Sequence, residues 1–136
     1  MINALDTTSS ALVAQRTRLN VISGNIANAF TTGQEDGTIE PYRRRVVTFS
    51  PERDDGGVGV SASEVIEDPS EFNLRYDPGH PHAIKEGPDA GWVQYPNVDL
   101  TMEYVDAIEA ARAYELNVAV MNVTKTMVRQ SIQLFA

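Results

Sequence analysis

Two imidazoles and a carboxylate lie close together in one turn-forming stretch. His80 and His82 flank a proline, and Asp77 precedes them by three residues. Imidazole nitrogens and carboxylate oxygens are common zinc ligands. No further strong ligand follows at a familiar spacing, and stretches rich in proline and glycine typically lie at the surface. A small enzyme or metal site using these three side chains is therefore kept only as an alternative, and we predict no metal and no cofactor.

Other candidate motifs are weaker. The GGVG run at residues 56–59 lacks both the strand–turn–helix context and the following Lys-Ser/Thr of a phosphate loop. No Gly-x-Ser-x-Gly sequence is present, and the absence of cysteine excludes a thiolate nucleophile. Three arginines at residues 43–45 lie among acids, so they predict salt bridges within or between subunits. We predict that the chain is not an enzyme.

The charge distribution argues against nucleic acid and lipid as partners. The net charge of the 136 residues is −8, so little would neutralise phosphates or an anionic membrane surface. Residues 31–98 carry thirteen acids and six bases, whereas residues 1–30 and 99–136 carry +1 and −2. No stretch reaches the ~20 apolar residues of a membrane span, and residues 1–6 lack the pattern of a signal peptide. Near-neutral ends on an acidic middle suit a subunit whose ends are buried by partners.

Residues 1–30 predict an amphipathic helix over 6–28, with Asp6 or Thr7 as its N-cap. Two rows at seven-residue spacing form a weak coiled-coil seam: Leu5, Leu12, Leu19 and Ile26, with Thr8, Gln15 and Ile22 between them. The helix would be ~33 Å long.

Residues 31–98 predict a small β-rich insert. A polar loop with two glycines leads to Pro41, and strand-like segments follow at residues 45–49, 58–66, 72–76 and 92–95. Residues 54–57 and 77–79 have the composition of turns.

Residues 99–136 predict a second helix, ~54 Å long, because residues 99–134 contain neither proline nor glycine. Asp99 or Thr101 would cap it. At 100° per residue it carries two apolar faces. One contains Met102, Val105, Ile108, Leu116, Ala119, Val120, Val123, Met127 and Leu134, and the nearly opposite face contains Ala110, Tyr114, Val118, Met121, Val128 and Ile132. A helix on the surface of a small domain needs one such face, so two faces imply neighbours on two sides.

The expected fold is therefore mainly α with a small β insert. The long terminal helices would pair as an antiparallel coiled-coil-like hairpin, with the short strands and loops between them. Polar residues among apolar helix positions can fix the register between helices. The predicted assembly interface is Leu12, Leu19, Asn20, Ile22, Asn25, Ile26, Asn28, Val105, Ile108, Arg112, Tyr114, Leu116, Asn117, Val120, Val123 and Met127.

Four runs resemble one known family. QRTRLNVISGNIANA at residues 15–29 is similar to the N-terminal motif of bacterial flagellar rod and hook proteins. PYRRRVVTF at 41–49, with YDPGHP at 76–81 and GWVQYPNVD at 91–99, resembles the short proteins of the proximal rod. AARAYELNV at 110–118 matches the Ala-x-Arg-x-Tyr-x-x-Asn run of the second helix.

The resemblance implies a structural subunit of the flagellar basal-body rod, the drive shaft that crosses the periplasm. Such proteins are exported without a cleaved signal peptide by the flagellar type III apparatus, and they assemble helically with other rod proteins and further copies of themselves. The terminal helices would form the inner core around the export channel, and the insert would face outward. The isolated monomer is expected to have largely disordered terminal segments. Another axial subunit, or a helical adaptor of the cytosol, is the alternative that shares most of these features.

Overall fold

Two long helices and two small antiparallel sheets make up the chain in the computed structural model, which describes residues 2–33, 39–52 and 59–135. The elements follow in the order α1 (Ile2–Ala27), β1 (Arg45–Glu52), β2 (Gly59–Glu67), β3 (Asn73–Tyr76), β4 (Trp92–Tyr95) and α2 (Leu100–Phe135). The prediction of a mainly helical chain with a small β insert is confirmed. Within the described residues, no helix is both long enough and apolar enough to cross a membrane.

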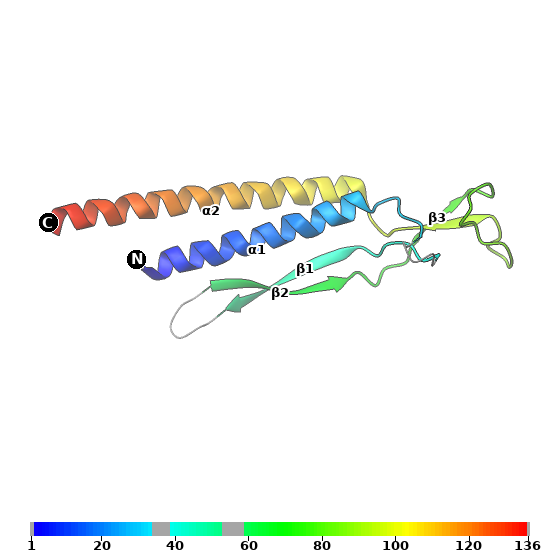
Figure 1. The fold of residues 1–136 in the computed structure, drawn as a ribbon, viewed down its shortest axis with the longest axis horizontal. Coiled ribbons are helices and arrows are strands. Elements are labelled where there is room, and N and C mark those ends of the chain that lie inside the picture. The colour runs from blue at the N-terminus through cyan, green and yellow to red at the C-terminus, as the bar shows by residue number, and fades with distance from the viewer. Residues whose placement is uncertain (1, 34–38, 53–58, 136) are drawn as a thin grey trace.

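Helix α1 lies between the other two layers (Figure 1). It packs against α2 on one side and against the β1–β2 hairpin on the other. The hairpin folds back along α1, and the backbone N–H of Val60 donates to Ser10 Oγ at 3.1 Å. Register runs from Arg45 opposite Glu67 to Glu52 opposite Gly59, with an irregularity after Thr48. The predicted turn at residues 54–57 lies outside the described residues.

The seven-residue rows of α1 mark its covered side. Thr8 and Ile22 are buried, and the other members of the two rows are partly buried. The solvent side carries Ala4, Asp6, Ser9, Val13, Arg16, Asn20, Ser23 and Ala27. This alternation follows from the spacing of three and four residues between neighbours on one helix face.

The β3–β4 sheet lies at the end of the molecule where α1 finishes and α2 begins (Figure 1). Asn73 pairs with Tyr95 at one end of the register and Tyr76 with Trp92 at the other. The rings of Tyr76 and Trp92 meet edge to face, with centroids 5.6 Å apart. Gly91 beside them has φ of 87°, a conformation that disfavours any side chain.

The predicted N-cap of α2 is confirmed, and the predicted N-cap of α1 is wrong. Asp99 caps α2, since its Oδ1 accepts from the backbone N–H groups of Thr101 at 2.8 Å and Met102 at 3.4 Å. The predicted cap of α1 at Asp6 or Thr7 is wrong, because the helix begins at Ile2. Polar side chains here bond within the helix instead, as Thr8 Oγ1 donates to the carbonyl of Ala4 at 2.7 Å.

Candidate assembly surface and polar junction

A buried carboxylate joins the two helices to the start of the first sheet. Glu103, in the first turn of α2, is completely buried. It accepts from Arg44 Nε at 2.6 Å and from Asn25 Nδ2 at 3.1 Å. A buried charge is costly unless it is paired and hydrogen-bonded, and both conditions hold here.

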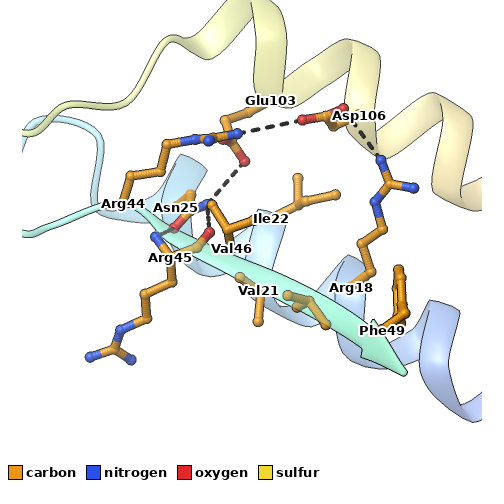
Figure 2. Close-up of a pocket in the computed structure, with 11 residues that line it drawn as sticks. Arg18, Val21, Ile22, Asn25, Arg44, Arg45, Val46, Phe49, Glu103 and Asp106 are labelled. Carbon is orange, nitrogen blue, oxygen red and sulfur yellow. Dashed lines mark hydrogen bonds and ion pairs between the residues drawn. The ribbon is translucent and has the colours of Figure 1, made fainter. Parts of the chain in front are cut away.

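The Asn25 amide binds the backbone where β1 begins (Figure 2). Its Nδ2 donates to the carbonyl of Arg45 at 2.8 Å, and its Oδ1 accepts from the Arg45 N–H at 2.9 Å. The Tyr42 hydroxyl donates to the same Oδ1 at 3.0 Å. The Asn25 amide thus satisfies both backbone groups of Arg45, as a neighbouring strand would. This requires a side chain with both an acceptor and a donor.

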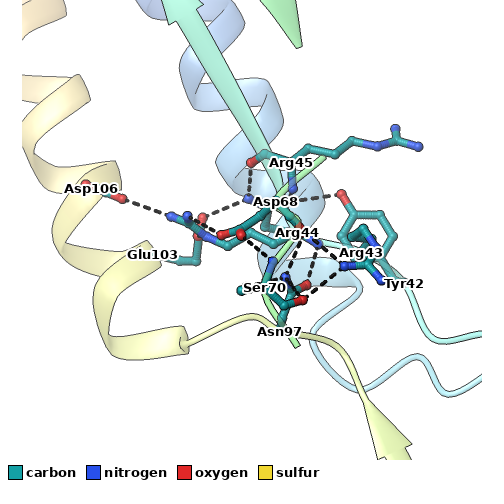
Figure 3. A network of polar contacts seen from close by, with 10 residues as sticks. Tyr42, Arg43, Arg44, Arg45, Asp68, Ser70, Asn97, Glu103 and Asp106 are labelled. Carbon is teal, nitrogen blue, oxygen red and sulfur yellow. Dashed lines mark hydrogen bonds and ion pairs between the residues drawn. The ribbon is translucent and has the colours of Figure 1, made fainter. Parts of the chain in front are cut away.

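A second asparagine holds the other side of this segment (Figure 3). Asn97 Oδ1 accepts from the backbone N–H of Arg44 at 2.8 Å, and its Nδ2 donates to Ser70 Oγ at 2.8 Å. The Arg44 guanidinium also lies 3.5 Å from Asp68 Oδ2 and from Asp106 Oδ2. We call Asn25, Tyr42, Arg44, Asp68, Asn97 and Glu103 the polar junction.

The junction perturbs three ionisable groups. The backbone N–H and hydroxyl of Ser70, and then Arg44, lower the pKa of Asp68 below its ordinary value. Burial opposes the charge on Arg44, but its hydrogen bond to Glu103 and the nearby carboxylates outweigh burial and raise its pKa. Burial raises the pKa of the Tyr42 hydroxyl. All three directions favour the protonation states that these hydrogen bonds use at neutral pH: a charged Arg44, an ionised Asp68 and a neutral Tyr42 hydroxyl.

A cavity of about 310 Å³ lies beside the junction, between α1, β1 and α2 (Figure 2). Val21, Ile22 and Phe49 are among its apolar lining residues. Its charged groups are paired, because Arg18 lies 3.4 Å from Asp106, which also faces Arg44. The cavity therefore offers no free acid or base for catalysis.

Among the described residues, one face of α2 carries a row of exposed apolar side chains. We call the first apolar face of the sequence prediction the α2 stripe: Met102, Val105, Ile108, Leu116, Ala119, Val120, Val123, Met127 and Leu134. Its large side chains are between 52% (Val120) and 85% (Leu134) exposed. The opposite face packs toward α1 only in part. Ala110 is fully buried and Met121 and Val128 are partly buried, whereas Tyr114, Val118 and Ile132 are exposed. One of the two predicted neighbours is therefore α1 of the same chain.

The predicted interface residues divide into two groups. Some are buried or partly buried within the chain: Leu12, Leu19, Ile22, Asn25, Ile26, Asn28 and Asn117. The others are exposed: Asn20, Val105, Ile108, Arg112, Tyr114, Leu116, Val120, Val123 and Met127. The structure thus separates residues that hold the chain together from residues that remain available to a partner.

Two of the three arginines, Arg44 and Arg45, form salt bridges within the chain, as predicted, whereas Arg43 contacts backbone carbonyls and an aromatic ring. Arg44 belongs to the junction, and Arg45 lies 4.0 Å from Glu67. Arg43 donates to the carbonyls of Asp68 and Ser70, and its guanidinium lies 4.3 Å from the centre of the Phe72 ring.

The histidines contact their own surroundings. His82 Nδ1 lies 2.9 Å from Thr32 Oγ1, and His80 Nδ1 accepts from the backbone N–H of His82 at 3.1 Å. Across the described ranges, no three His, Cys, Asp or Glu side chains are grouped as a metal site would require. The alternative metal or enzyme function therefore gains no support from this loop.

Comparison with known proteins gives the same class at both ends of the chain. Residues 5–33 match the family model "Flagella basal body rod protein", and residues 89–134 match "Flagellar basal body rod FlgEFG protein C-terminal". Paired terminal helices with these two matches define a flagellar rod protein, as the resemblance predicted.

Curated relatives identify the particular family. The chain is 40% identical to the flagellar basal-body rod protein FlgC of Borreliella burgdorferi, over 97% of this chain and 95% of the relative. Identity is 39% to FlgC of Bacillus subtilis, over 97% and 96%, and 39% to FlgC of Salmonella typhimurium, over 98% and 97%. The chain belongs to the FlgC family of flagellar basal-body rod proteins, and it is a structural subunit of the rod, not an enzyme.

Sequence reasoning included Asn25 but missed Tyr42, Asn97 and Glu103 as parts of one cluster. A signal was present, because the first two lie in the runs that carry the family resemblance at residues 41–49 and 91–99. The structure brings these runs together with residues 15–29 at the polar junction. Glu103 carried no comparable signal, since an acid in the first turn of a helix is also explained by the helix dipole.

Proposed function

We propose that the α2 stripe is the main surface through which this chain packs into the rod, beside other rod proteins and further copies of itself. The observation that supports it is a row of apolar side chains running most of the length of α2 and left in contact with water. Burying such a face contributes ~25 cal/mol per Å² of apolar area removed from water. Monomers rarely expose so continuous an apolar surface without a binding role.

Polar residues on the exposed faces would set the register between neighbours. Arg112 lies on the same face of α2 as the stripe, and Asn20 lies on the solvent side of α1. An unpaired polar group in an apolar interface is costly, so each would select neighbours that provide a partner. Head-to-tail contacts between different surfaces produce open helical assemblies, which suit a rod.

The proposed arrangement places residues 1–30 and 99–136 in the inner core around the export channel and residues 31–98 outward. The acidic insert, at −7, suits the solvent-facing position, and the near-neutral helices suit the packed one. The rod would transmit torque through these packed helices. The polar junction would keep the insert fixed to the helices under that load.

The proposal includes export from the cytoplasm to the periplasmic rod by the flagellar export apparatus, without a cleaved signal peptide. The support is that the chain belongs to a family of flagellar basal-body rod proteins.

The test is substitution of Leu116, which is 68% exposed at the middle of the stripe. We expect Leu116→Asp to abolish motility and to exclude the chain from purified basal bodies, because a carboxylate would be buried without a partner. Asn122→Asp is the matched control, since Asn122 is exposed on α2 outside the stripe. His80→Ala and His82→Ala should incorporate normally. Wild-type motility of the Leu116 variant would refute the proposal.

A further inference from the structure

A shallow groove on the outer face of α2 is lined by residues whose order of apolar and charged side chains is nearly symmetric along the helix. Its lining forms three pairs placed symmetrically about the point between residues 110 and 111: Val105 with Leu116, Ile108 with Ala113, and Glu109 with Arg112. Each pair combines apolar with apolar or acid with base. A surface that is complementary to itself under a two-fold rotation is the requirement for an isologous dimer.

We propose that this groove binds the α2 groove of a second copy of the chain, as an antiparallel helix pair centred between residues 110 and 111. The inference does not depend on the rod interface proposed above, although it uses part of the same stripe. Its occupant follows from the symmetry and the charges of the groove itself.

The spacing of residues along this face of α2 fits such a pair. Residues 102, 105, 109, 112, 116 and 119 follow the alternating steps of three and four that form a coiled-coil seam. In the antiparallel register, Val105 meets Leu116 of the second copy, and Met102 meets Ala119. The overlap from residue 102 to 119 covers about 27 Å of helix.

The central charges select the antiparallel direction. Glu109 of each copy meets Arg112 of the other, which gives two ion pairs related by the two-fold axis. In a parallel pair at the same register, each glutamate would meet a glutamate and each arginine an arginine. Like charges in contact are destabilising, so the parallel pair is disfavoured.

The contacts within one chain leave this arrangement open. Arg112 is exposed and, in the part of the chain that the structure describes, has no acidic partner. Glu109 Oε2 lies 3.7 Å from Arg18, but its side chain remains 67% exposed. A glutamate can accept from two arginines at once, because its two oxygens offer about four acceptor positions.

A two-fold dimer is a closed assembly that adds no further copies, whereas a rod is an open helical assembly. The dimer would cover Val105 and Leu116 in both copies, so a chain cannot be in the dimer and use these residues in the rod at the same time. Self-association would therefore keep the exposed stripe away from water until rod partners compete for it.

Cysteine cross-linking gives the direct test, because the chain has no cysteine of its own. A mixture of Val105→Cys and Leu116→Cys chains should form a mixed disulfide dimer under mild oxidation. Each variant alone should form at least tenfold less, because equivalent residues would lie about 16 Å apart, beyond disulfide reach. Dimers from Val105→Cys alone, or no cross-linking in the mixture, would overturn the proposal.

Exchange of the two central charges is the second test, and each substitution keeps a charged side chain at an exposed position. Glu109→Arg and Arg112→Glu should each weaken dimerisation about tenfold by sedimentation equilibrium, because each places like charges at the centre. The double variant, which exchanges the two charges, should recover the wild-type dissociation constant. A monomer at every concentration, or an affinity unaffected by either change, would contradict the inference. Incorporation of Leu116→Asp into basal bodies is a separate measurement, so either proposal can fail alone.

Discussion

Asn25 illustrates how one side chain can decide where two elements meet. Its amide pairs with both backbone groups of Arg45 and also donates to Glu103. Aspartate lacks the donor, and leucine would leave the Arg45 backbone groups unpaired. The sequence predicted that Asn25 matters but assigned it to contacts between subunits. Its role depends on a residue 20 positions away in the chain, and helical periodicity carries no information about that approach.

Glu103 provides the sharpest prediction for a single side chain. Glu103→Gln should lower the free energy of unfolding by about 2–3 kcal/mol, because the amide nitrogen of glutamine would face either the Arg44 or the Asn25 donor. The loss of stability should be smaller than on breaking an isolated buried ion pair, because Arg44 would still have ion pairs with Asp68 and Asp106. Urea denaturation of the purified monomer measures it.

Glu115→Gln is the control, as the same change at an exposed position of the same helix. It should alter the free energy of unfolding by no more than about 0.5 kcal/mol. Equal stability of the two variants would mean that the junction contributes nothing to the fold.

Helices and strands were the most predictable level of this structure. The absence of proline and glycine over residues 99–134 gave α2 within a residue of its bounds. Alternating apolar residues predicted β2 and β3, and short apolar or aromatic runs predicted β1 and β4. What could not be predicted was where the first hairpin packs. Its strands carry apolar residues on a narrow face, and only the structure shows that this face lies along α1.

The helix starts show why local rules succeed in one place and fail in another. Asp99 follows a proline-containing segment that cannot continue a helix backward, so its side chain is free to cap α2. Asp6 is preceded by residues that extend α1 by one further turn, and the cap rule alone does not reveal this.

Asp99→Ala should therefore destabilise the start of α2. We expect a loss of about 1 kcal/mol, because two backbone N–H groups lose their acceptor. Asp99→Asn should retain most of the stability, since asparagine caps helices about as well as aspartate. Thermal unfolding followed by circular dichroism compares the two variants. An alanine variant as stable as the asparagine variant would show that the cap contributes nothing measurable.

The molecule as a unit is packed most firmly at one end. The polar junction holds the C-terminal end of α1 against the start of α2, and both fully buried residues described in α2, Glu103 and Ala110, lie in its first third. Helix α2 has 36 residues against 26 in α1. Because Asn25 contacts Glu103 and Arg18 contacts Asp106, the first residues of α1 reach only part of the way along α2. The remainder of α2 has little to pack against within one chain.

Backbone amide exchange should follow this gradient. In dilute solution, amides at residues 121–135 should exchange at least about 100-fold faster than those at 103–114, because local opening there breaks few buried contacts. This narrows the expectation of disordered terminal segments in the monomer to the far end of the helix pair. Arg112→Glu, which should dimerise about tenfold more weakly, tests whether self-association protects residues 102–119 when it is compared with the wild type at the same concentration. Uniform protection along α2 in a proven monomer would mean that one chain completes its own helix packing, and the argument that the α2 stripe awaits a partner would lose its physical basis.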